Sequence, residues 1–274
     1  MTTNEQRVTG IVPQMLNPVN ENEVQRLIAD YRFWVQQKFD GKRTLIRNVA
    51  GEVTGINRKG LSIRLPEPVV AAVKMIKVSC IIDGESCGNV FHAFDLLEMN
   101  SVELRKLSYS ERLRQLENLL AKSTGAIKWV ETAKAQKEKS ALLARLQSEE
   151  QEGVVFKRCD ALYVPGRPAS GGSQLKFKFY ATASCIVVKI NVKRRVALEL
   201  RDGGKSIGVG NVTIPWNQEI QAKGAIIELK YLYAFPKGAL FQPTYLGQRD
   251  DIEADACTTA QLKYKPDTDN EDDA

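Results

Sequence analysis

The segment at residues 38–43 places Lys38, Asp40 and Arg43 around Gly41. This spacing suits a lysine amine that attacks a nucleotide phosphate. Such an amine must be uncharged, so its ordinary pKa of about 10.4 has to be lowered by burial or by neighbouring cations. The plainer interpretation is that Asp40 and Gly41 form a β-hairpin turn between two apolar runs, with solvated basic residues beside it.

Two glutamates further along the chain could hold a metal ion. Glu85 follows Gly84, and Glu152 precedes Gly153. Carboxylates next to glycine turns are well placed to bind Mg²⁺, although an Asp-Gly pair such as Asp83-Gly84 is also an ordinary turn.

Two lysines near the middle of the chain complete the group of charged candidates. Lys176 and Lys178 are separated by one residue on a predicted strand, so both ammonium groups point to one side and can reach one phosphate. With Arg43 and a metal ion, they could offset the charge that develops during phosphoryl transfer. The simpler alternative is that they form the wet face of a strand.

In this order, and with Lys38 leading, these segments closely resemble the signature of covalent nucleotidyltransferases, specifically ATP-dependent DNA ligases of the minimal two-domain type. The resemblance implies an enzyme that seals nicks between a 5′-phosphate and a 3′-hydroxyl in duplex DNA through a lysyl-AMP intermediate. ATP would be the cofactor, with Mg²⁺, or Mn²⁺ as an alternative ion. It also implies a part in DNA repair, replication and recombination.

The resemblance assigns roles to individual side chains. The residues expected to take part in catalysis are Lys38, Asp40, Lys176 and Lys178. Those expected to bind the nucleotide are Arg43, Glu85, Phe94, Glu152, Arg249 and the same two lysines, with Phe94 stacked on adenine. Arg43 and Arg58 would contact the nick, and Glu85 and Glu152 the metal.

The C-terminal part of the chain is similar to the terminal ligase motif, in which an arginine, an aspartate and a lysine orient the ATP pyrophosphate. Arg249 and Asp251 match this motif, but Ile252 replaces the lysine. The replacement either weakens self-adenylation or moves the leaving-group contact to another cation, such as Lys237 or Lys263.

Composition favours a polyanionic partner. The chain of 274 residues has a net charge of +6, and several of its acids lie in the last residues, so the rest is more basic. We expect a cytoplasmic protein without a membrane partner, because the sequence has neither a signal peptide nor a membrane-spanning run. We also expect a monomer.

The histidine and cysteine content excludes several classes of site. His92 is the only histidine, which argues against serine–histidine triads and multi-histidine metal centres, and it is expected in a strand without a chemical role. The five cysteines form no C-x-x-C pair and are predicted to be reduced.

The predicted fold class is α+β: an adenylation domain with mainly antiparallel sheets at 1–180, an oligonucleotide-binding (OB) fold barrel at 181–265, and a disordered acidic tail at 266–274. Hydrophobic periodicity and capping residues predict helices near 20–31, 66–77, 108–120 and 132–147. The lysines at 134, 137 and 139 are expected on a solvated helix face. The barrel strands are predicted at 184–192, 196–201, 206–214, 226–235 and 240–246.

The sequence at 203–206 matches the end of the phosphate-binding loop motif, but Glu199 stands where that motif requires its first glycine. A hairpin turn is the expected structure there.

Other functions remain open at this stage. An RNA ligase uses the same lysyl-AMP chemistry, and a capping guanylyltransferase shares it with GTP. A non-catalytic nucleic-acid binding module would use the positive charge together with Tyr231 and Tyr233.

Overall fold

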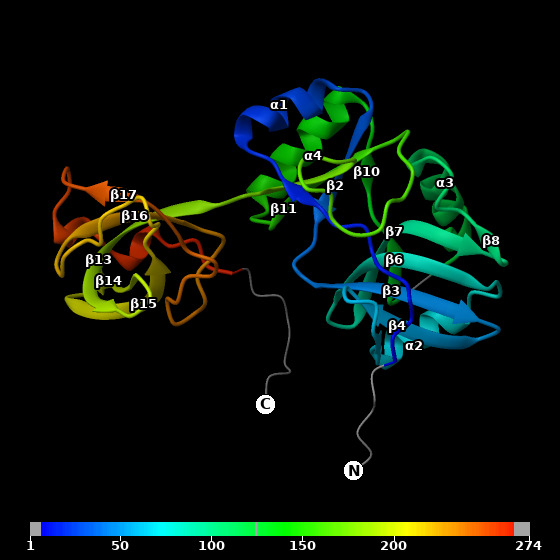
Figure 1. Cartoon of the computed structure of the whole chain (residues 1–274), viewed down its shortest axis with the longest axis horizontal. Helices are drawn as coiled ribbons and strands as arrows, with labels where there is room; N and C mark the ends of the chain where they lie inside the picture. Colours follow the sequence, from blue (N-terminus) through cyan, green and yellow to red (C-terminus); the bar gives the residue numbers. More distant parts are fainter. Residues whose placement is uncertain (1–6, 124, 266–274) are drawn as a thin grey trace, which may run out of the picture. The chain divides into compact units, whose positions relative to one another are not determined.

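A computed structural model of the chain describes residues 7–123 and 125–265. The chain forms two compact units, Met1–Phe177 and Lys178–Ala274 (Figure 1). The sequence places the domain boundary at residue 180, and the predicted acidic tail at 266–274 lies outside the described residues.

A five-stranded sheet in the first unit carries Lys38 at the end of one of its strands. The order of strands is β1 (Asn17–Pro18), β12 (Gln174–Lys178), β11 (Gly153–Arg158), β2 (Phe33–Lys38) and β10 (Thr132–Ala133). β2 and β11 are antiparallel, with Lys38 opposite Gly153, whereas β1 and β12 are parallel. Lys38 is therefore the last residue of a strand that has a neighbour on each side.

A second sheet, of seven strands, follows the Lys38 segment. Its strands are β3 (Lys42–Val49), β4 (Glu52–Asn57), β5 (Ser62–Ile63), β6 (Cys80–Cys87), β7 (Val90–Met99), β8 (Val102–Glu103) and β9 (Ile127–Trp129). Neighbouring strands are antiparallel, except that β9 is parallel to β7. Because β2 and β3 belong to different sheets, the hairpin interpretation of Asp40-Gly41 is wrong. This turn carries the chain from one sheet to the other.

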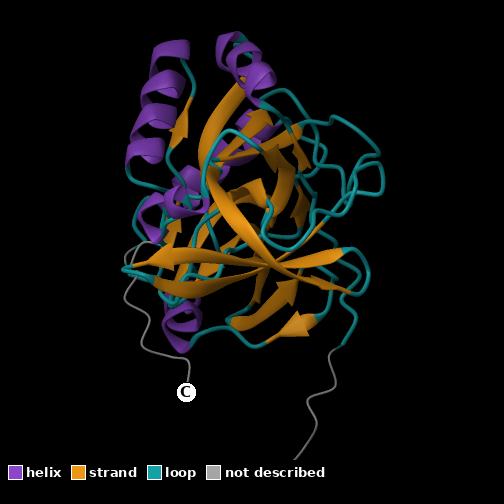
Figure 2. Ribbon diagram, turned by 90° about the vertical axis from the view of Figure 1, so that its left-hand side faces the viewer, coloured by secondary structure: helices purple, strands orange, loops and turns teal. Residues whose placement is uncertain are grey.

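Helices pack against the strands of the first unit (Figures 1 and 2). α2 (Glu67–Lys74) and α3 (Tyr109–Leu120) contribute Val73, Leu113 and Leu116 to the same apolar core as the second sheet. Ser108 caps α3 by accepting a hydrogen bond from the backbone N–H of Glu111, as its sequence predicts.

α1 (Glu21–Ala29) and α4 (Gln136–Ser148) complete the set of four α-helices within the described ranges. The sequence offers Asn20 and Asn22 as caps of this helix, and Asn20 is the residue that caps α1. α4 begins later than predicted because residues 132–133 form β10. Lys139 is not on a solvated face: its side chain is buried and donates hydrogen bonds to three carbonyls, those of Leu27, Asp30 and Phe33.

The second unit is a five-stranded antiparallel sheet with its own apolar core. The order of strands is β15 (Lys205–Thr213), β14 (Arg195–Asp202), β13 (Ala181–Asn191), β16 (Ile226–Tyr231) and β17 (Thr244–Arg249). All five predicted strands are present. β16 ends before the predicted position 235, and β17 lies at 244–249 rather than at the predicted 240–246, because the chain turns at residues 235–239. The predicted α+β class with mainly antiparallel sheets is confirmed.

The predicted hairpin at 203–206 is also confirmed. Gly203 and Gly204 join β14 to β15 with φ angles of 52° and 82°, and Asp202 is paired with Lys205. Within the described part of the chain, no helix is long and apolar enough to cross a membrane.

Candidate active site

The amine of Lys38 forms an ion pair with the carboxylate of Glu152, and both side chains are largely buried, with 18% and 5% of their surface exposed. The strand register explains the contact: Glu152 directly precedes Gly153, which lies opposite Lys38. Lys38 Nζ also donates to the carbonyl of Phe39 at 3.4 Å. The charged partner of the predicted nucleophile in this structure is therefore a carboxylate rather than a cation.

The turn that follows Lys38 is anchored to the second sheet. The Phe39 ring stacks on His92 with centroids 3.8 Å apart. A Cβ atom at Gly41 would lie 2.5 Å from the carbonyl oxygen of Ser86, so only glycine fits there. Asp40 between them is exposed. Burial, with Lys128, lowers the pKa of His92 to about 4, which keeps this strand histidine neutral.

The guanidinium of Arg43 is paired with a buried carboxylate and does not face an open ligand site. Its Nε and Nη2 atoms each lie 2.7 Å from an oxygen of Asp83, which is fully buried. The Tyr163 hydroxyl donates to the same carboxylate at 2.7 Å. Burial opposes the charge of Arg43, but Asp83 outweighs it and the pKa of the guanidinium is raised. The pair fixes β3 to β6 beside the Lys38 turn.

Glu85 lies opposite Arg43 in the β3–β6 register. Burial raises the pKa of its carboxyl group to about 7, against the opposing effects of Arg43 and Lys38. A bound cation would stabilise the charged form of this carboxylate.

Glu85 and Glu152 together suit Mg²⁺. Within the described ranges no cluster of three or more His, Cys, Asp or Glu side chains forms a metal site. Mg²⁺ commonly binds one or two carboxylates together with substrate phosphates and water, so two glutamates are a sufficient protein contribution.

Two cations lie on the ring of Phe94. Arg43 Cζ is 4.5 Å and Lys157 Nζ is 4.0 Å from the ring centroid. Lys157 is 3% exposed, and its burial lowers the pKa of the amine to about 7. Sequence reasoning gave Lys157 no role. The available signal was its position on β11, two residues after Val155, which places both side chains on the same face of the strand.

A cavity of about 40 Å³ lies between residues of the two sheets of the first unit. Side chains from six strands and two connecting segments line it: Leu16, Gln36, Gln37, Lys38, Phe39, Arg43, Glu85, Phe94, Val155, Lys157 and Gln174. Its volume suits a water molecule rather than a nucleotide base, so a base enters only if lining side chains move.

Gln174 brings an unused acceptor to this cavity. The residue is 5% exposed, and its Oε1 atom has no hydrogen-bond partner among the described residues. Its Nε2 atom donates to Gln14 at 3.0 Å. On β12, Gln174 shares a strand face with Lys176. A buried carbonyl oxygen without a partner is a natural contact for an N–H group of a ligand.

The remaining predicted residues lie outside the cavity lining. Lys176 is on β12 opposite Pro18, and Lys178 donates to Gln242 at 3.1 Å within the second unit. Arg58 is exposed in the turn after β4.

Arg249 lies on β17 of the second unit, where it forms ion pairs with Asp251 and, at 3.4 Å, with Glu228. Its hydrogen bond to Asp251 lowers the pKa of that carboxyl group. Ile252, which stands at the position of the expected lysine, packs against the apolar core of this unit.

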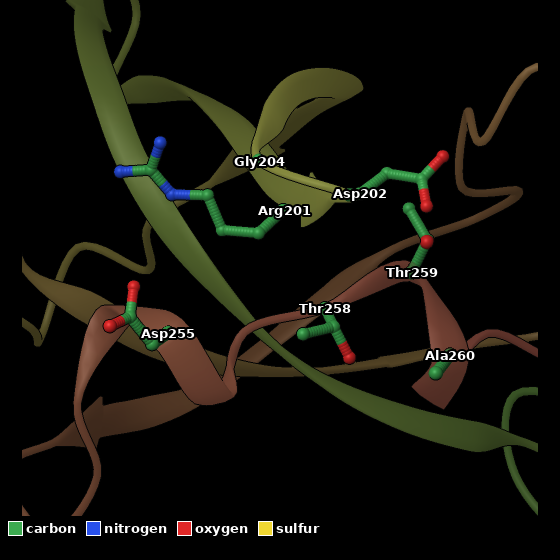
Figure 3. A pocket seen from close by; sticks show the side chains of 8 residues that line it. Arg201, Asp202, Gly204, Asp255, Thr258, Thr259 and Ala260 are labelled. Carbon is green, nitrogen blue, oxygen red and sulfur yellow. The ribbon is translucent and has the colours of Figure 1, made fainter.

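A separate pocket of about 630 Å³ lies beside the β14–β15 turn. Figure 3 shows Asp202 from this turn and Asp255 from a different segment among its lining side chains. Two carboxylates against one arginine, Arg201, make it a poor phosphate site, which agrees with the assignment of the glycine pair to a hairpin turn.

A comparison with protein families identifies the middle of the chain. Residues 86–178 match the family model of the ATP dependent DNA ligase domain. The resemblance to ATP-dependent DNA ligases is confirmed. The matched segment includes Phe94, Glu152, Lys176 and Lys178, whereas Lys38 lies ahead of it.

Solved structures of DNA ligases share the fold. The ligase domain of LigD from M. tuberculosis is 18% identical, with 92% of this chain and 99% of that chain covered and a TM-score of 0.56. A Lig E DNA ligase is 17% identical, with 87% and 99% covered and a TM-score of 0.65. The structure entitled Pmar-Lig_PreS3 is 16% identical, with 87% and 67% covered and a TM-score of 0.69. No curated protein sequence matches the chain.

Proposed function

We propose that the protein is an ATP-dependent DNA ligase that seals nicks in duplex DNA through a lysyl-AMP intermediate. The observation that carries the proposal is the contact of Lys38 with Glu152 at a cavity that Arg43, Glu85 and Phe94 also line. The family match of residues 86–178 supports it.

In the first step, Lys38 Nζ attacks the α-phosphorus of ATP. A phosphorus–nitrogen bond forms, the bond to the pyrophosphate oxygen breaks, and the amine loses a proton. Glu152 is the carboxylate in contact with this amine, so it is placed to receive that proton. A 5′-phosphate oxygen of the nick then attacks the AMP phosphorus, and the phosphorus–nitrogen bond breaks and frees Lys38. The 3′-hydroxyl, oriented by Asp40, attacks the 5′-phosphorus, loses its proton to solvent and displaces AMP.

Glu85 and Glu152 would hold Mg²⁺, which when bound supplies positive charge beside the phosphates. Lys176, Lys178 and Arg43 are the proposed phosphate contacts of the chain itself. Arg58 is proposed to contact the nick.

The cavity favours adenine over guanine. The exocyclic amine of adenine can donate to the unpartnered Oε1 of Gln174, whereas guanine carries an acceptor oxygen at the equivalent position. Phe94, which also lines the cavity, is the proposed stacking partner of the adenine ring. Both features support ATP as the nucleotide.

The second unit is proposed to be an OB-fold domain that binds DNA, with Arg249 and Asp251 orienting the pyrophosphate. Its five antiparallel strands, in the order β15-β14-β13-β16-β17, support this assignment.

Incubation with α-labelled ATP and Mg²⁺ tests the proposal. The wild-type chain should become labelled and Lys38→Ala should not, whereas Lys42→Ala, which changes an exposed lysine at the start of β3, should label normally. Label retained on Lys38→Ala would end the assignment.

The choice of polynucleotide needs its own assay. Sealing of nicked duplex DNA in preference to RNA supports the proposal, and preference for RNA would indicate an RNA ligase. Labelling by GTP alone would indicate a guanylyltransferase, and binding of nicked DNA with no adduct would indicate a non-catalytic module.

A further inference from the structure

The β13–β14 turn of the second unit carries residue types that are unusual for its backbone conformation. Its two central residues, Lys193 and Arg194, have φ angles of 56° and 57°. Such a turn favours Asn-Gly, because positive φ is unfavourable for residues with a Cβ atom. Basic side chains at this strained tip therefore indicate a function other than closing the hairpin.

Arg194 holds an adjacent loop in place. Its guanidinium donates to the carbonyls of Ile214 at 3.2 Å and Pro215 at 3.0 Å, and also to that of Gln218. The guanidinium carbon lies 5.1 Å from the ring centroid of Trp216. One strained arginine thus positions the loop that presents Trp216.

The positioned loop displays a large apolar side chain to solvent. Trp216 is 88% exposed and Val192, beside Lys193 in the turn, is 82% exposed. Tryptophan is enriched at interaction sites relative to the rest of the protein surface.

The β13–β14 turn and its flanks carry charge of one sign, whereas the Trp216 loop adds one exposed acid, Glu219. Four of the seven residues at 189–195 are basic and none is acidic. Lys189, Lys193 and Arg195 are exposed, whereas Arg194 is engaged with the loop. Phosphate groups complement the three exposed cations, and sugar and base edges complement Trp216.

We propose that Lys189, Val192, Lys193, Arg195 and Trp216 form a DNA-contacting surface of the second unit, the Trp216 surface. The cations contact backbone phosphates, and the indole packs against a sugar or base edge. The choice of duplex DNA as the polyanion rests on the proposed function, whereas the surface itself rests on exposure, charge and backbone strain.

The test is equilibrium binding of the full chain to a fluorescent duplex with a central nick bearing a 5′-phosphate, measured over a range of salt concentrations. Trp216→Ala should weaken binding about tenfold. Lys193→Asn, which suits the turn, should weaken binding and reduce the salt-dependence slope by about 0.9.

Matched controls separate this surface from general charge effects. Lys205→Asn removes one charge at the opposite end of β14, and Trp129→Ala removes an exposed tryptophan of the first unit; both should bind DNA normally. Equal losses for Lys193→Asn and Lys205→Asn, or no loss for Trp216→Ala, would overturn the proposal. So would loss of binding to phosphatidylserine vesicles with DNA binding unchanged.

Lysyl-AMP formation needs no DNA, which keeps the two proposals separable. All four variants should form the adduct at the wild-type rate. If the wild-type chain forms no adduct while the Trp216 and Lys193 variants still lose DNA affinity, the Trp216 surface stands and the ligase assignment fails.

Discussion

Lys38 and Glu152, 114 residues apart in the sequence, form an ion pair that joins the end of β2 to the start of β11. The carboxylate is 5% exposed, and the amine compensates its charge. The predicted nucleophile therefore also has a structural role in the resting protein.

This double role separates two substitutions at position 38. Lys38→Arg keeps a cation beside Glu152 but lacks the nucleophilic amine, and Lys38→Ala removes both. Neither variant should form lysyl-AMP, but Lys38→Ala should be less stable than Lys38→Arg by about 1–3 kcal/mol, because it removes the ion pair of a largely buried carboxylate. Urea unfolding measures the difference. Equal stability of the two variants would show that the ion pair contributes nothing to folding.

Glu85 should make stability depend on pH. Burial raises the pKa of its carboxyl group from 4.5 to about 7 in the folded chain. The folded state therefore binds more protons than the unfolded state between these values, and this group lowers stability as pH rises through that window.

Glu85→Gln removes the free-energy cost of keeping this buried carboxylate charged in the folded chain. The variant should be more stable than the wild type by about 2–3 kcal/mol at pH 8 and by much less at pH 5. Denaturant titrations at several pH values between 5 and 8 provide the measurement, with the exposed Glu52→Gln as a control that changes little. A constant difference across this range would contradict the role of burial.

Local signals predicted the parts of the fold that depend on neighbouring residues. The Asn20 cap of α1, the Ser108 cap of α3 and the β14–β15 turn at Gly203 are examples. Each depends on side-chain or backbone geometry within a few residues, which the sequence displays directly.

Contacts between segments far apart in the chain could not be predicted from local sequence signals. Nothing near Asp40-Gly41 indicates that the flanking strands join different sheets. Lysine is usually a surface residue, but Lys139 and Lys157 are both buried against partners far away in the sequence. The same holds for Arg112, which forms a fully buried ion pair with Asp95.

The unpartnered Oε1 of Gln174 should contribute to nucleotide selectivity. Gln174→Leu has a similar shape but no acceptor for the adenine amine. We expect the preference for ATP over GTP in adduct formation to fall by about tenfold, since one lost hydrogen bond is worth about 1–1.5 kcal/mol. Labelling with the two nucleotides measures this ratio. Gln115→Leu, on α3, is the control, and an unchanged preference in Gln174→Leu would exclude the contact.

Ile252 stands where the resembled motif has a lysine, but its side chain packs against the apolar core of the second unit. Ile252→Lys should therefore lower stability by about 1–3 kcal/mol, because it replaces packed apolar surface with a charged group. It should not accelerate lysyl-AMP formation. Ile252→Leu keeps the packing and should match the wild type in both respects. A several-fold gain in adduct rate for Ile252→Lys, with stability unchanged, would instead mean that the position faces the leaving group and that its lysine is a lost catalytic contact.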